Sequence, residues 1–157
     1  MAHRHKSLGA GAFLLILTLT IVLSDTTRAE KNDDLIIAHL EFLGYTCDVV
    51  EQGIRARHSS KIHLLLSHAQ GGILLQTGFP GKRTSGEEGA RYAVLNTVNS
   101  RTRVARVFWT PDGNLFVSAW MPGSYEKARF AAFMDAWEQD GLTLRDFSLE
   151  LKSFLAQ

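Results

Sequence analysis

The sequence predicts an α+β domain in which an antiparallel sheet packs against helices, in the order α-β-β-β-α-β-β-α. Three segments repeat apolar residues every three or four positions, which indicates amphipathic helices. Between them apolar and polar residues alternate, which is typical of half-buried strands. Of the 157 residues, 45% are hydrophobic and 21% are charged, a globular composition that excludes a disordered or collagen-like chain.

The N-terminal segment has the layout of an export signal. A basic head at residues 3–6 is followed by an uncharged apolar run of 16 residues, Leu8 to Leu23, and by a small residue at Ala29. We expect cleavage after Ala29, which divides the chain into a signal peptide, 1–29, and a single domain, 30–157. The periplasm or the exterior is then the expected location. An uncleaved inner-membrane anchor is the alternative, although the run is shorter than the roughly 20 residues that span a bilayer.

Removal of the signal changes the net charge from +1 to −1, so the mature surface has no basic field of the kind that binds nucleic acid. Cys47 is the single cysteine, which excludes an internal disulfide framework. We expect it to be a buried small apolar side chain.

The first helix is expected to begin after the polar residues 32–34 and to end at Gly44, a common C-terminal stop. From Cys47 to Phe79 the period changes to two, which predicts three strands. Ser59-Ser60 and residues 69–72 are the expected turns.

The second helix is expected to begin at Ser85, because Glu88 stands three residues later in a reciprocal capping arrangement. Two rows of side chains are expected along it, Tyr92-Leu95-Asn99 and Ala90-Val94-Val98. Ser124 is expected to cap the third helix. The third helix and a short final helix share a stripe expected in the core: Phe130, Phe133, Met134, Trp137, Leu144, Phe147, Leu151 and Phe154.

Residues 104–110 and 115–121 are predicted to form a hairpin around the three-residue loop Pro111-Asp112-Gly113. This loop places Thr110 opposite Asn114. The register then creates a wholly apolar core face, made of Ala105, Val107, Trp109, Leu115, Val117, Ala119 and Met121.

The opposite face of this hairpin is the predicted partner-binding surface. It carries Phe108, Phe116 and Trp120 around the charge of Arg106, and such apolar surface in a small domain indicates contact with a protein partner or with a second copy of the chain. The alternative is that the final helix covers these side chains within the monomer.

The order of elements resembles that of the YbjN-domain family, whose fold is similar to that of type III secretion chaperones. The resemblance rests on Leu95-Asn96-Thr97-Val98-Asn99 at the end of the second helix and on Ala105-Arg106-Val107 with Asp112-Gly113-Asn114-Leu115 in the hairpin. It implies an α+β domain, often dimeric, that binds proteins and has no known catalytic residues. Members are described as candidate regulators of sensory transduction.

No catalytic, cofactor or metal site is predicted, and the expected protein is not an enzyme. His58, His63 and His68 are five residues apart, so neighbouring members would point to opposite faces of a strand. A turn at Ser59-Ser60 would place His58 beside Lys61. Neither a Gly-x-Ser-x-Gly elbow nor a glycine-rich phosphate loop occurs.

Two classes of function follow. The first is an exported, noncatalytic, chaperone-like binding or regulatory module of the bacterial cell envelope. The alternative is a small-molecule or lipid carrier, or an unrecognised enzyme, with a pocket between the sheet and the second helix. Asn96, Asn99 and Arg106 would be the polar groups at the mouth of that pocket.

Overall fold

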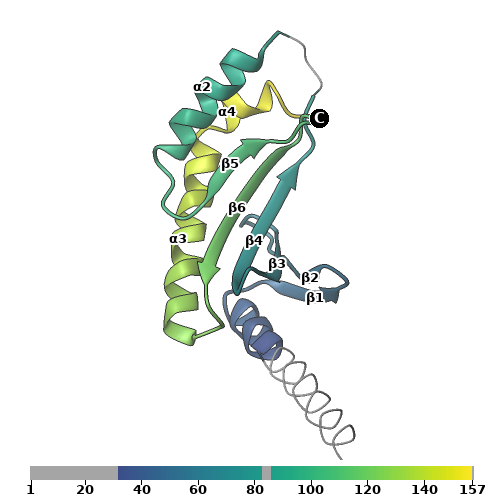
Figure 1. Ribbon diagram of the computed structural model, residues 1–157, viewed down its shortest axis with the longest axis vertical. Helices are drawn as coiled ribbons and strands as arrows, with labels where there is room; N and C mark the ends of the chain where they lie inside the picture. The colour runs from purple at the N-terminus through teal and green to yellow at the C-terminus, as the bar shows by residue number, and fades with distance from the viewer. Residues whose placement is uncertain (1–31, 83–85, 157) are drawn as a thin grey trace, which may run out of the picture.

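The computed structural model describes residues 32–82 and 86–156. Within them, six strands form one antiparallel sheet in the order β1-β2-β3-β4-β6-β5 (Figure 1). The predicted signal peptide and the predicted cap at Ser85 lie outside the described residues. In chain order, residues 32–42 are helical and are followed by β1 (Thr46–Val50), β2 (Gly53–Arg57), β3 (Leu64–Ala69), β4 (Gly72–Phe79), α2 (Glu88–Asn99), β5 (Arg106–Trp109), β6 (Leu115–Pro122), α3 (Lys127–Asp146) and α4 (Ser148–Lys152).

The predicted α+β class is confirmed, but the segment before α2 contains four strands and not three. The additional hairpin is β1 and β2, which turn at Glu51 and Gln52. Gly53 makes this turn fit against β3. Its φ is +135°, and a Cβ there would lie 2.0 Å from the carbonyl oxygen of Leu66, so only glycine is accommodated. The alternation within β2 is regular, but the turn lacks the Asn-Gly or Asp-Gly pair typical of a tight hairpin, so the sequence pattern does not separate β1 from β2.

The predicted register of the second hairpin is confirmed. Val107 pairs with Val117 and Phe108 with Phe116, and the Thr110 amide donates to the Asn114 carbonyl over 2.8 Å. Gly113 closes the loop with a φ of +85°. The predicted core face is buried apart from half-buried Trp109.

One prediction about the helices is wrong. The cap of α3 is Glu126 and not Ser124, because the extended backbone at Glu126 lets its carboxylate accept from the amides of Ala128 and Arg129. These two hydrogen bonds lower the pKa of the Glu126 carboxyl. In α2, Tyr92 is exposed and Arg91 is buried with Leu95 and Val98.

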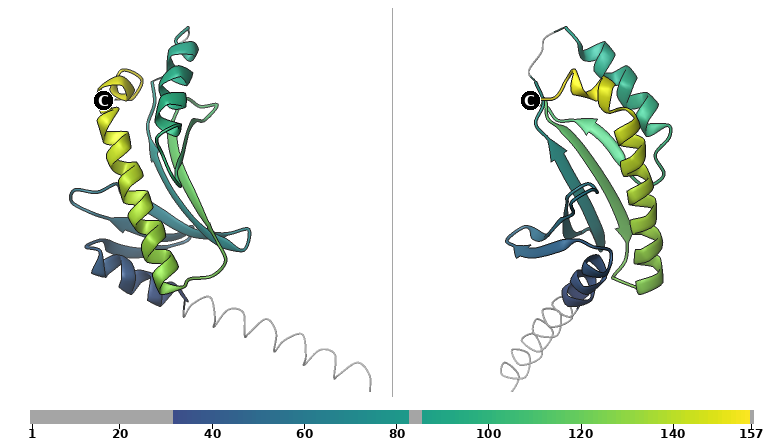
Figure 2. Two further views of the ribbon diagram at one scale, coloured as in Figure 1. Left: turned by 90° about the vertical axis from the view of Figure 1, so that its left-hand side faces the viewer. Right: turned by 180° about the vertical axis from the view of Figure 1, so that it is seen from behind.

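The helices lie on one side of the sheet. Figure 2 shows α3 along one face, and no described helix along the other. The helix α2 packs beside the edge strand β5 and against α4. The core lies between sheet and helices, and its largest fully buried side chains include Trp137, Phe130, Ile36, Leu40 and Ile54. Within the described ranges, no helix combines the length and apolarity needed to cross a membrane.

Candidate protein-binding face

The uncovered side of the β5–β6 hairpin carries the four predicted site residues, and we call it the outer face. It consists of Arg106 and Phe108 in β5 and of Phe116 and Trp120 in β6. Phe108 is 41% exposed and Trp120 is 46% exposed, while Phe116 is half-buried and Arg106 is exposed. The alternation of the strands therefore brings the four residues together on one open surface.

The aromatic rings of the outer face lie across β4, where two glycines leave space for them. A Cβ at Gly72 would lie 2.5 Å from Nε1 of Trp120, and one at Gly78 would lie 3.1 Å from Cζ of Phe116. Trp120 Nε1 also donates to the carbonyl of Ala69 over 3.0 Å. These contacts pack the two rings against β4 in the absence of a partner.

Phe108 extends the aromatic surface to the edge of the sheet. Its ring stacks on that of Phe116, with centroids 6.1 Å apart and planes 27° apart. Arg106 is beside them in β5 and donates from Nη1 to the Ala105 carbonyl over 3.0 Å. The outer face is thus an apolar platform with one cation at its margin.

The final helix does not cover this face, so that alternative prediction is wrong. Leu151 and Phe154 are buried on the core side of the sheet. The ring of Phe154 meets the edge of Trp109, with centroids 6.2 Å apart, and Trp109 belongs to the core face. Helix α4 consequently closes the core and leaves the aromatic platform open.

The free edge of β5 is sealed by a side chain from α2. Asn99 was expected at the mouth of a pocket, but its amide accepts from the Val107 N–H and donates to the Val107 carbonyl, both over 2.9 Å. The side chain thus imitates a neighbouring strand and blocks further strand addition there. Asn96 is exposed on α2 and Arg106 is on the outer face, so the three predicted anchors do not form one site.

Two buried charged side chains position β5, and neither was predicted. Asp140, 1% exposed, accepts from the backbone N–H groups of Arg103, Val104 and Ala105 over 2.7–2.9 Å. Arg91 donates to the Lys82 carbonyl and places its guanidinium 4.9 Å from the ring centre of Trp109. A charge buried against distant backbone has no local sequence signal, so the pattern of α2 and α3 could not reveal either role.

The histidines serve the fold. His58 lies beside Lys61, as predicted, because its Nδ1 accepts from the Lys61 amide over 3.2 Å. It also lies beside His63, contrary to the prediction, because the His58 amide donates to Nδ1 of His63 over 3.1 Å. His68 Nε2 lies 2.7 Å from a carboxylate oxygen of Asp33. His39 Nδ1 lies 3.0 Å from the hydroxyl of Tyr125. Among the described residues, no three His, Cys, Asp or Glu side chains are grouped to hold a metal ion.

Cys47 is half-buried, and not fully buried as predicted. Burial, reinforced by the negative charges of Glu41 and Asp48, raises the pKa of the thiol to about 11. The thiol is therefore protonated at neutral pH, and the protonated form is a poor nucleophile and metal ligand.

A cavity of about 820 Å³ lies between α3 and the connection from β2 to β3. Its lining includes Tyr45, Ile62, Trp137 and Arg145, and contains no residue of α2. The predicted pocket between the sheet and the second helix is therefore not this cavity.

The fold is that of a YbjN-like α+β domain, as the resemblance predicted. The structure is similar to the crystal structure of YbjN from E. coli, described as a candidate transcription regulator, with a TM-score of 0.60. The two chains are 16% identical, and the likeness covers 79% of this chain and 95% of YbjN. No protein-family model matches the sequence, and no curated protein matches it.

Proposed function

We propose that this chain is a noncatalytic protein-binding module of the bacterial cell envelope, chaperone-like or regulatory, whose outer face receives an apolar segment of a partner or a second copy of the chain. The observation that carries the proposal is the open aromatic platform formed by Phe108, Phe116 and Trp120. Large rings exposed together on a sheet are characteristic of an interaction surface, whereas scattered exposed apolar residues are ordinary.

The construction of the platform supports a binding role. The rings of Trp120 and Phe116 pack over Gly72 and Gly78, and the Trp120 ring is also hydrogen-bonded to Ala69, so we expect binding to lose little side-chain freedom. The adjacent Asn99 amide blocks the edge of β5. We therefore expect the partner to contact the face of the sheet and not to add a strand beside β5.

A paired substitution tests the outer face. We expect Phe116→Ser with Trp120→Ser to abolish self-association or partner capture, measured by analytical ultracentrifugation of the purified protein and by pull-down from envelope extracts. The matched control is Phe42→Ser with Leu149→Ser, which removes two side chains that are 86% and 82% exposed elsewhere. Association that survives in the first variant, or is lost equally in the control, contradicts the proposal.

Unfolding of the paired variant would assign these rings to stability and not to binding. Phe108→Ser avoids that ambiguity, because the Phe108 ring lies at the sheet edge and is 41% exposed. Circular dichroism should be unchanged in this variant while association weakens by about thirtyfold, the effect expected of a hot-spot side chain.

The envelope location is a part of the proposal with its own test. It rests on the basic head, the apolar run and Ala29 in the sequence. Cell fractionation and intact mass should find a periplasmic or secreted chain that begins at Glu30. A full-length chain in the inner membrane would instead establish the uncleaved anchor.

A further inference from the structure

The cavity beside α3 has the size and walls of a small-molecule site, separate from the outer face. Its volume of about 820 Å³ lies within the roughly 300–1,000 Å³ of ligand pockets. Six of the lining residues form a largely apolar wall drawn from the β2–β3 connection, the sheet, α3 and α4: Ile62, Phe79, Leu115, Trp137, Leu144 and Leu151.

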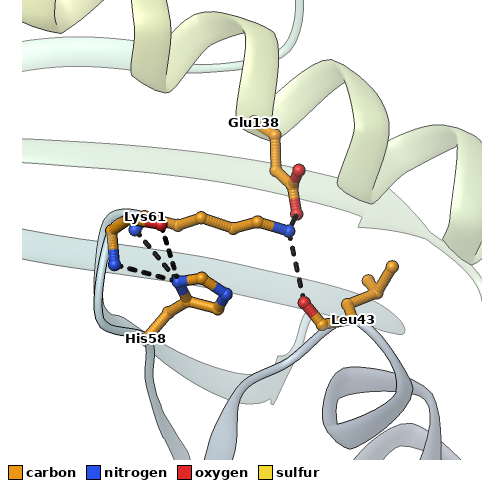
Figure 3. A network of polar contacts seen from close by, with 5 residues as sticks. Leu43, His58, Lys61 and Glu138 are labelled. Atoms are coloured by element: carbon orange, nitrogen blue, oxygen red, sulfur yellow. Dashed lines mark hydrogen bonds and ion pairs between the residues drawn. The ribbon is translucent and has the colours of Figure 1, made fainter.

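One wall of the cavity is the connection over residues 58–63, and Lys61 fastens it to α3. Figure 3 shows the Lys61 side chain reaching Glu138 of α3 and the carbonyl of Leu43. The ammonium lies 2.6 Å from Glu138 Oε1 and 3.3 Å from the Leu43 oxygen. His58 Nδ1 accepts from the backbone amides of Ser60 and Lys61, over 3.0 and 3.2 Å, and so shapes the connection (Figure 3).

Gly141 lets this connection approach α3. A Cβ at Gly141 would lie 3.1 Å from Cδ1 of Ile62, a tight contact. Glycine within a helix costs about 1 kcal/mol relative to alanine. The close approach of Ile62 explains why a glycine is present here despite that cost. Because Gly141 lines the cavity, a larger side chain at this position would enter it.

A buried donor without an acceptor points to a ligand. Tyr45 lines the cavity and is 3% exposed, and its hydroxyl has no hydrogen-bond partner among the described residues. A buried hydroxyl left unpaired costs about 1–3 kcal/mol, so it calls for an acceptor. An acceptor on a ligand in the cavity would satisfy it.

The lining charges favour an anion. Glu138 is paired with Lys61, whereas the exposed Arg145 guanidinium has no ion-pair partner in the described part of the chain. Arg145 lies seven residues after Glu138 along α3, which separates the two ends by roughly 10 Å. The cavity thus has a free cation near one end, an apolar middle, and the unpaired Tyr45 hydroxyl with the Lys61–Glu138 pair near the other.

We propose that this cavity binds an amphipathic carboxylate of medium chain length. Arg145 binds the carboxylate, the apolar wall holds the chain, and Tyr45 donates to a polar acceptor at the distal end. Arginine presents paired donors that match a carboxylate, which makes it the stronger anchor. Binding here is independent of the outer face, so a chain that binds a partner there can hold this ligand as well.

The test uses two probes, dodecanoate and 12-hydroxydodecanoate, at concentrations below those at which they form micelles. Each is titrated by isothermal calorimetry into the purified protein, in the form in which it is isolated from the producing cells. Both should bind, and the hydroxy acid should bind more tightly. Arg145→Ala should weaken both by about tenfold, as expected for a lost charge-assisted contact. The matched control is Lys152→Ala, which removes the same charge from an exposed residue outside the lining.

Two further variants separate the cavity from other apolar surfaces. Gly141→Leu should prevent binding while circular dichroism shows a folded chain, and Trp120→Ser should leave binding unchanged. Tyr45→Phe should remove only the advantage of the hydroxy acid over dodecanoate. The proposal is overturned if neither probe binds. It is also overturned if binding survives in Gly141→Leu but is lost in Trp120→Ser.

Discussion

The two faces of the β5–β6 hairpin both carry large apolar side chains but have opposite environments. On the core face Val107, Leu115 and Val117 are at most 3% exposed, whereas on the outer face Phe108 and Trp120 are more than 40% exposed. The strand geometry is common to both, so the difference comes from the helices, which pack on one side alone (Figure 2). Apolar character thus identifies a face suited to burial, and packing from distant elements decides whether burial occurs within the monomer.

The largest expected effect comes from replacing one tryptophan on each side of the sheet by alanine and comparing the two losses of stability. Trp137→Ala should lower the free energy of unfolding by about 4 kcal/mol, because the ring is 2% exposed in the core. Trp120→Ala should lower it by about 1 kcal/mol, since only the contacts over Gly72 and the hydrogen bond to Ala69 are lost. Urea unfolding measures both.

Equal losses from the two tryptophans would show that the outer face is energetically part of the core. That result would also weaken the proposal that its rings are available to a partner.

The second prediction concerns the hydrogen bonds by which Asp140 joins α3 to the backbone that precedes β5. Asp140→Ala should cost about 3 kcal/mol, because three backbone N–H groups before β5 lose their acceptor. Asp135→Ala, an exposed position on the same helix, is the control and should change stability by less than about 0.5 kcal/mol. A similar change in both variants would mean that solvent replaces the carboxylate without penalty.

The smallest expected effect concerns His39, half-buried at the rim of the covered side. Burial, with the positive charge of Lys127 adding to it, lowers the pKa of the imidazole below its ordinary value of about 6.5. The unfolded chain then binds the proton more readily, so stability is full above about pH 6.5 and falls as the pH drops toward the folded pKa.

NMR titration of the His39 ring measures that pKa directly. Lys127→Gln should move it upward, and His39→Gln should reduce the loss of stability on acidification. A pKa at or above about 6.5 in the unmodified protein would contradict the expectation.

The sequence predicted well where the determinants are local. Pro111-Asp112-Gly113 specifies a three-residue loop, and that loop with the strand alternation establishes which residue opposes Phe116. The first hairpin was missed although Ile54-Arg55-Ala56-Arg57 alternates regularly, because Glu51-Gln52 is not a characteristic hairpin-turn dipeptide; Gly53 was its one local signal. The Ser124 cap failed because α3 begins two residues later than the cap preference of serine predicts. The extended backbone at Glu126 makes a glutamate the cap, although glutamate is not a favoured cap residue.

By itself the sequence determined the α+β class, the register of the second hairpin and the membership of its two faces. These follow from short-range turn geometry and from the two-residue period of a strand. Only the tertiary structure decided that the aromatic face stays open, that Asp140 and Arg91 are buried, and that Tyr45 and Arg145 line one cavity. Those outcomes depend on contacts between residues far apart in the chain, and no local pattern of side chains encodes which distant backbone will meet them.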